Sequence, residues 1–203
     1  MTAPGDQEKS LYKLKIIATS TRPGRKSLLF STWIREIAKE YPDFETEILD
    51  LAEINLPFLD EPNHPMLRQY VHQHTRDWSA MIDGADAFII VTPEYNYGFT
   101  GVFKNAIDYL HHEWKYKPAG IVSYGGIAGG TRSVQLMKPV LTALSMMPLM
   151  EAVHIPFYTK SLDAEGKFVP TEQNIKAAQA MMASLVTWTG TLKTMRQQQR
   201  TSS

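Results

Sequence analysis

The sequence contains no cysteine, no excess of charge of either sign and no long apolar run. Without cysteine the chain can form neither disulfides nor thiolate metal sites, and it has no thiol nucleophile. Lysine plus arginine equals aspartate plus glutamate at 21 each, so the sequence lacks the basic excess typical of nucleic-acid-binding proteins. No segment approaches the roughly 20 apolar residues of a membrane span, and the start MTAPGDQEKS has no signal-peptide core. We therefore expect a cytoplasmic protein without nucleic-acid or membrane partners.

Several motifs for metal binding and catalysis are also absent. The sequence has no H-E-x-x-H zinc motif, no G-x-S-x-G nucleophile elbow, no Walker motif and no G-x-G-x-x-G dinucleotide fingerprint. The acids Glu94 and Asp108 show no spacing that suggests a catalytic carboxylate pair. The sequence therefore predicts neither a metal site nor a catalytic acid–base residue.

The apolar residues, 43% of 203, suffice for one domain with a substantial core. Apolar, β-branched runs alternate with segments of helical period, which is the pattern of a parallel sheet covered by helices on both faces. We expect strands at residues 14–19, 44–49, 87–92, 119–124 and 152–157, and helices at 27–40, 67–82, 101–110, 131–147 and 171–195. The predicted fold is α/β, with a doubly wound five-stranded parallel sheet and an extra C-terminal helix. It forms a single domain over residues 1–203, with loose ends at 1–11 and 196–203.

Three unusual loops follow predicted strands, where doubly wound folds bind their ligands. The first is STRPGRKS at residues 20–27, and it leads into a predicted helix whose exposed N–H groups favour an anion. Hydroxyls at Ser20 and Ser27 and guanidiniums at Arg22 and Arg25 suit a single phosphate. An ordinary polar turn in which Ser27 caps the helix explains this loop equally well.

The second loop is TPEYNYGFT at residues 92–100. Pro93 fixes its own backbone angle, and Gly98 leaves room for a flat ligand to approach. The side chains offer ring faces for stacking and an amide for hydrogen bonding: Tyr95, Tyr97, Phe99 and Asn96. The alternative is a surface turn whose rings pack back on the domain. The density of aromatic residues at the end of a strand favours a ligand.

The third loop is SYGGIAGGTR at residues 123–132. Its four glycines bring bare backbone close to a neighbouring group. The alternative is a flexible connection, which is disfavoured because ordering four glycines costs considerable entropy. Together the three loops predict a site for a flat ligand that carries a phosphate.

Three segments resemble the NAD(P)H-dependent FMN reductase family: STRPGR, DLAEINLPFLDEP and TPEYNYGFTGVFKNAIDYL. This flavodoxin-like group includes quinone, azo-dye and chromate reductases. The resemblance runs from about Lys13 to Phe157, and P-E-Y-N followed by G-x-x-K-N-A-I-D is its most specific part. One difference is Thr19, where the family usually has glycine and where a side chain would crowd the phosphate turn.

The resemblance implies FMN as the cofactor and NADPH or NADH as the co-substrate. It implies that the phosphate is bound by Ser20, Arg22, Arg25 and Ser27. The segment along the ribityl chain and flavin ring is Pro93, Glu94, Tyr95 and Asn96, with Gly98 at the ring edge. A second ring-side loop is Ser123, Tyr124, Gly125 and Gly126, and the substrate side is lined by Tyr97 and Phe99.

The implied activity is electron transfer from NAD(P)H, through the bound flavin, to a quinone or a similar small acceptor, such as a flavin, an azo compound or a metal oxyanion. The family also implies a homodimer or homotetramer. Two alternatives remain open at this point. One is a flavin-binding sensor or carrier that acts through a partner protein, and the other is a scaffold that has lost its cofactor.

Overall fold

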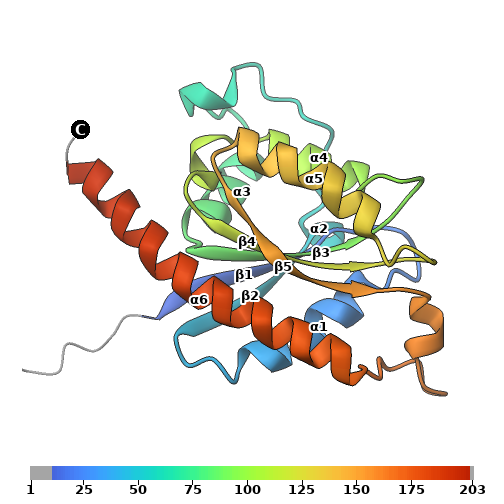
Figure 1. Ribbon diagram of the computed structural model, residues 1–203. Coiled ribbons are helices and arrows are strands. Elements are labelled where there is room, and N and C mark those ends of the chain that lie inside the picture. The colour runs from blue at the N-terminus through green and yellow to red at the C-terminus, as the bar shows by residue number, and fades with distance from the viewer. Residues whose placement is uncertain (1–10, 202–203) are drawn as a thin grey trace, which may run out of the picture.

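The computed structural model describes residues 11–201 and contains one parallel sheet (Figure 1). Its strands are β1 (Tyr12–Ala18), β2 (Phe44–Asp50), β3 (Ala87–Pro93), β4 (Pro118–Tyr124) and β5 (Met147–Ile155). They lie in the order β2-β1-β3-β4-β5, which is the flavodoxin-like order with its switch point between β1 and β3. The doubly wound, five-stranded parallel sheet predicted from the sequence is therefore confirmed.

Helices cover both faces of the sheet (Figure 1). One face carries α1 (Ser27–Ala38) and α6 (Glu172–Thr201), and the other carries α3 (Gln73–Asp83), α4 (Gly101–Asp108) and α5 (Thr131–Ala143). Shorter segments are α2 (Leu51–Ile54), η1 (Pro65–Leu67), η2 (His112–Trp114) and η3 (Tyr158–Ser161). Strands β1 to β4 supply residues to both cores, because successive side chains alternate between faces. In β1, for example, Ile16 packs in the α1 and α6 core, whereas Ile17 packs in the opposite one.

Several element boundaries differ from the sequence-based expectation; the helix expected at 131–147, for example, ends at Ala143. β5 begins at Met147, not at residue 152, and it contains Pro148. An edge strand tolerates proline, because one side of it makes no ladder hydrogen bonds. The expected helix at 67–82 begins only at Gln73, because residues 65–67 form η1 and Arg68 ends it with a left-handed φ of 51°.

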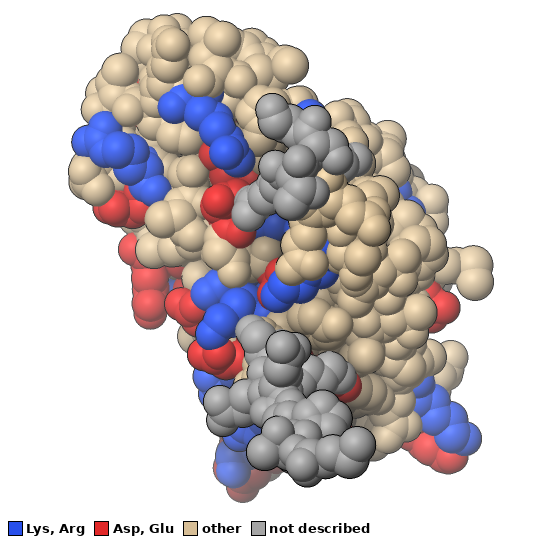
Figure 2. All heavy atoms as spheres, turned by 90° about the vertical axis from the view of Figure 1, so that its left-hand side faces the viewer, with Lys and Arg blue, Asp and Glu red and all other residues tan. Residues whose placement is uncertain are grey.

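The C-terminal helix is longer than predicted. α6 continues to Thr201. The loose end expected from residue 196 is therefore wrong for residues 196–201. Lys193 and Arg196 hold this end by pairing with Asp86 at 2.8 and 2.9 Å. Figure 2 views the molecule from this end and shows basic and acidic side chains interspersed. Apart from residue 11, the loose N-terminal end predicted at 1–11 lies outside the described residues.

At its start, α6 is capped by Thr171, whose Oγ1 accepts from Asn174 N at 3.2 Å. Asn174 Oδ1 in turn accepts from Thr171 N at 3.0 Å, so the two residues cap the helix reciprocally. Within residues 11–201, no helix is both long enough and apolar enough to cross a membrane.

Candidate functional site

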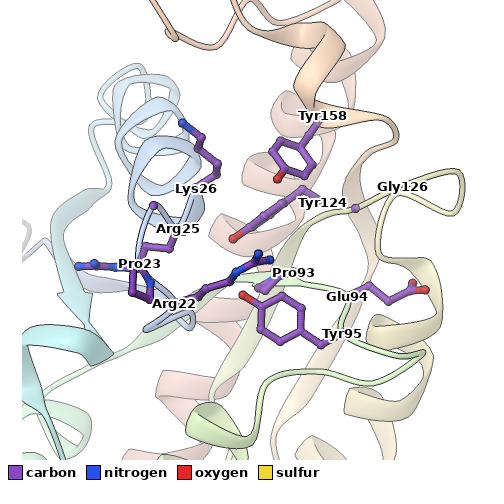
Figure 3. A pocket seen from close by; sticks show the side chains of 12 residues that line it. Arg22, Pro23, Arg25, Lys26, Pro93, Glu94, Tyr95, Tyr124, Gly126 and Tyr158 are labelled. Atoms are coloured by element: carbon purple, nitrogen blue, oxygen red, sulfur yellow. The ribbon is translucent and has the colours of Figure 1, made fainter.

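Loops after β1, β3 and β4 meet at the carboxyl edge of the sheet and form a cavity of about 320 Å³ (Figure 3). These are the three loops that the sequence singled out, and the segment after β5 completes the wall. The lining residues are Arg22, Pro23, Gly24, Arg25, Lys26, Pro93, Glu94, Tyr95, Tyr124, Gly125, Gly126 and Tyr158.

The first loop leads into an uncapped helix terminus. Lys26 occupies the N-cap of α1 without a side-chain capping hydrogen bond, and the first turn of α1 has no acidic residue. The helix dipole and the free N–H groups of the first turn therefore give this end partial positive charge. Figure 3 shows Arg22 reaching into the space between Tyr95 and Tyr124. The alternative in which Ser27 caps the helix is wrong, because Ser27 is the first helical residue.

Arg25 also lines the cavity, but its guanidinium is bound to a neighbouring strand. Its Nη2 donates to Asp50 Oδ2 at 2.5 Å. Asp50 also accepts from Ala52 N at 3.0 Å and so caps α2. This ion pair ties the first loop to the end of β2 and holds Arg25 in place. Direct contact between Arg25 and a phosphate stays a prediction.

Neither Ser20 nor Ser27 of the first loop lines the cavity. Ser20 Oγ is 2.8 Å from the phenol oxygen of Tyr95, and Ser27 is fully buried. Thr19 Oγ1 donates to Val91 O at 3.0 Å, so its hydroxyl is directed at β3. The expected crowding of the phosphate turn by Thr19 stays a prediction.

The second loop is a tight turn. Tyr95 and Gly98 exchange both backbone hydrogen bonds at 2.9 Å. The two residues between them, Asn96 and Tyr97, have left-handed φ values of 49° and 71°, as in a type I′ turn. This geometry puts the Tyr95 ring in the cavity and exposes Asn96 and Tyr97 at the tip of the turn. Asn96 and Gly98 are not among the cavity-lining residues.

Glu94 lies at the cavity wall, but its side chain is directed away from the cavity (Figure 3). Its carboxylate pairs with Arg132 Nε at 2.6 Å and accepts from Arg132 N at 3.2 Å. Glu94 therefore links the second loop to the start of α5. The Arg132 guanidinium also lies 3.9 Å from the centre of the Tyr97 ring.

Ser123 and His154 hold the third loop in place. Ser123 Oγ donates to Gly129 O at 2.8 Å and lies 2.7 Å from His154 Nδ1. Because Ser123 gives its hydroxyl proton to Gly129 O, its Oγ accepts from His154 Nδ1. Burial lowers the pKa of His154. Gly130, with a φ of 87°, is required because a Cβ there would lie 2.7 Å from Ser123 Cβ. Gly125 and Gly126 remain as bare backbone on the wall.

Of the predicted site residues, eight line the cavity: Arg22, Arg25, Pro93, Glu94, Tyr95, Tyr124, Gly125 and Gly126. Phe99 does not; it packs on Phe103 with ring centres 6.1 Å apart. The sequence reasoning missed Pro23, Gly24, Lys26 and Tyr158. Lys26 could have been found, because it directly precedes a predicted helix start. Tyr158 gave no signal, because it is brought to the cavity only by the turn after β5.

Comparisons with known proteins agree with this architecture. The family model described as NADPH-dependent FMN reductase matches residues 12–160. The chain belongs to this family. An NAD(P)H-dependent FMN reductase of Schizosaccharomyces pombe is 41% identical over 160 residues, which cover 77% of this chain and 80% of that protein. An FMN-dependent NADPH-azoreductase of Staphylococcus aureus is 28% identical over 165 residues, which cover 80% and 87%.

A solved structure shows the same fold. The flavoenzyme NAD(P)H:(acceptor) oxidoreductase FerB of Paracoccus denitrificans aligns with a TM-score of 0.69 at 21% identity, covering 89% of this chain and 98% of that one. The family model and the Schizosaccharomyces pombe relative confirm the predicted family. The oxidoreductase class, the FMN cofactor and the nicotinamide co-substrate predicted from the sequence are those of the family.

The cavity suits FMN on its own chemistry. The uncapped end of α1, with Arg22 and Lys26 beside it, offers the positive charge and the N–H donors that favour a phosphate monoester. A Cβ added at Gly24 or Gly126 would meet no protein atom within 4 Å, so the absence of side chains there keeps the space open for a ligand. Burial raises the pKa of the Tyr124 phenol, which therefore stays neutral and can donate a hydrogen bond.

Proposed function

We propose that this protein is an FMN-dependent oxidoreductase that takes electrons from NADH or NADPH and delivers them to small acceptors. Quinones and azo compounds are the main candidates, with free flavins and metal oxyanions as further ones. The observation that carries the proposal is the uncapped end of α1, which faces a cavity walled by Arg22, Lys26, Tyr95 and Tyr124. The azo acceptor is further supported by the name of the Staphylococcus aureus relative.

The residues of the chain have separate tasks in this proposal. Arg22, Lys26 and the first turn of α1 hold the phosphate. Tyr95 and Tyr124 provide aromatic surface and neutral phenol groups, and Gly125 and Gly126 let backbone approach a flat ring. When bound, FMN supplies the hydride and electron chemistry, whereas the protein orients the reactants and sets the electrostatics. This division agrees with the lack of a predicted catalytic acid or base.

The deciding experiment is a visible spectrum of the purified protein, followed by anaerobic addition of NADH or NADPH. We expect bound FMN to bleach with at least one nucleotide and to regain its colour when a quinone or an azo dye is added. Steady-state turnover then separates an enzyme from a flavin sensor, which would bleach but turn over very slowly. Colourless protein that retains no added FMN would contradict the proposal.

The homodimer or homotetramer and the cytoplasmic location expected from the sequence stay predictions. Light scattering of the FMN-loaded protein measures the first, and fractionation of the source cells measures the second.

A further inference from the structure

Glu94, Arg132 and Tyr97 form a chain of contacts next to the cavity. Part of Glu94 lines the cavity. Its carboxylate pairs with Arg132 Nε at 2.6 Å. The Arg132 guanidinium covers one face of the Tyr97 ring, with its Cζ 3.9 Å from the ring centre. Within residues 11–201, the terminal nitrogens of Arg132 make no hydrogen bond. They leave a planar fork of donors of the kind that binds two oxygens of a phosphate.

Tyr97 occupies a position where the backbone favours glycine. Its φ of 71° is left-handed, which is uncommon for a bulky residue and costs free energy. In return, the turn presents a tyrosine ring that is 64% exposed. Because one face of the ring is covered by Arg132, the other is left for a flat ligand.

A shallow hollow of about 310 Å³ lies at this contact, lined by Tyr97, Thr131, Arg132, Gln135 and Leu136. It combines an aromatic face, an aliphatic side chain and the free guanidinium fork. A purine base that carries a nearby phosphate matches this combination, because the base stacks on tyrosine and the phosphate binds arginine. Glu94 on the cavity wall pairs with Arg132 in the hollow, so the two sites adjoin and one dinucleotide can place its reactive ring at the cavity and its adenosine at the hollow.

We propose that Arg132 and Tyr97 bind the adenosine 2′-phosphate end of NADPH and make the protein prefer NADPH to NADH. The proposal rests on the proposed function, because it names the co-substrate that the same site selects. NADH has a 2′-hydroxyl in place of the phosphate and cannot use both arms of the arginine fork.

The test variant has to remove Arg132 without leaving an unpaired carboxylate that would itself repel a phosphate. We therefore combine Arg132→Ala with Glu94→Gln. Arg132→Lys keeps the charge but loses the planar fork. Lys138→Ala is the matched control, because it removes one positive charge from α5 outside the hollow. The kcat/KM for NADPH and for NADH is measured with one uncharged quinone.

We expect the double variant to lower the ratio of kcat/KM for NADPH to kcat/KM for NADH by about 30-fold, as for the loss of a charge-assisted phosphate contact. Arg132→Lys should lose part of the preference, and Lys138→Ala should keep it. Equal losses for both nucleotides, or an unchanged ratio, would overturn the proposal. If kcat/KM fell equally for both nucleotides and the oligomeric mass also changed, the proposal would be overturned and Arg132 would be assigned to a subunit contact.

A binding measurement separates this inference from the proposed function. Calorimetry on the FMN-loaded protein compares 2′,5′-ADP with 5′-AMP and needs no turnover. We expect 2′,5′-ADP to bind more tightly, and the difference to vanish in the double variant. If that holds but neither nucleotide bleaches the flavin, the proposed function fails and the binding site stands. If the two fragments bind wild-type protein equally, the inference fails whatever the activity.

Discussion

Ser20 Oγ lies 2.8 Å from the phenol oxygen of Tyr95, although 75 residues separate them in the chain. This hydrogen bond joins the loop after β1 to the loop after β3, on either side of the switch point. It links the part of the cavity that suits a phosphate to the part that suits a ring. A change at either residue should therefore affect the whole ligand.

Tyr95→Phe removes this link and keeps the aromatic ring. We expect FMN to bind about fivefold more weakly, since one hydrogen bond is worth about 1 kcal/mol. Fluorescence titration of the FMN-free protein measures the change. Tyr41→Phe is the control, because it removes a hydroxyl that bonds to Gln179 O outside the cavity. Equal effects of the two substitutions on the FMN Kd would refute a specific role for Tyr95.

Arg22→Ala tests the phosphate end of the cavity. We expect FMN affinity to fall by about 10- to 150-fold, as for the loss of a charge-assisted hydrogen bond of about 1.5–3 kcal/mol. Riboflavin, which has no phosphate, should bind the variant and the wild type to within about threefold. Lys39→Ala, at the other end of α1, should leave both ligands unaffected. A parallel loss of riboflavin binding would place Arg22 at the ring and not at the phosphate.

Gly130→Ala tests the third loop. A Cβ there would lie 2.7 Å from Ser123 Cβ, and φ is 87°. We expect the free energy of unfolding to fall by about 2–4 kcal/mol, from backbone strain and overpacking together. Gly101→Ala is the contrasting control, because no atom lies within 4 Å of its added Cβ and the residue begins α4. That change should stabilise by up to about 1 kcal/mol. Urea unfolding compares the two, and equal effects would argue against the packed loop.

Lys117 predicts a pH dependence of stability. Burial lowers the pKa of its amine to about 7, against 10.5 for the free side chain. Between these values the unfolded chain binds a proton that the folded protein does not, so the free energy of unfolding should rise as pH increases from about 7 to 10.5. Nζ donates to Ile82 O at 2.7 Å and Asp83 O at 2.9 Å, which a neutral amine can still satisfy.

The measurement is urea unfolding of wild type and Lys117→Met across this pH range. The variant loses two hydrogen bonds and is less stable at every pH. The readout is therefore the slope of the free energy of unfolding against pH. The difference between the two curves isolates Lys117. A variant that keeps the wild-type slope would show that other groups cause the dependence.

The sequence predicted the sheet and the three loops that wall the cavity because both depend on local chemistry. Apolar runs marked the strands, and the three loops contained residues that a core cannot accommodate, such as the glycines from Gly125 to Gly130. Once a parallel sheet was inferred, these loops had to meet at one edge.

The rest depends on contacts between distant residues. Glu94 was expected beside the flavin, but Arg132, 38 residues later, binds its carboxylate. Arg25 was expected at the phosphate, and Asp50 holds its guanidinium. Thr19 was expected to crowd the turn, and Val91 O accepts its hydroxyl. No local pattern encodes such partners, because each is set by which strands become neighbours.

The course of α6 has a practical consequence for attaching this protein to a surface. The helix has 30 residues, so it is about 45 Å long, and Figure 1 shows it running from the side of the loops to the opposite end of the molecule. Anchoring the protein to an electrode through the last turns of α6 would leave the cavity facing the solution. Current should then require a dissolved mediator, because the electrode and the cavity would lie at opposite ends of the molecule.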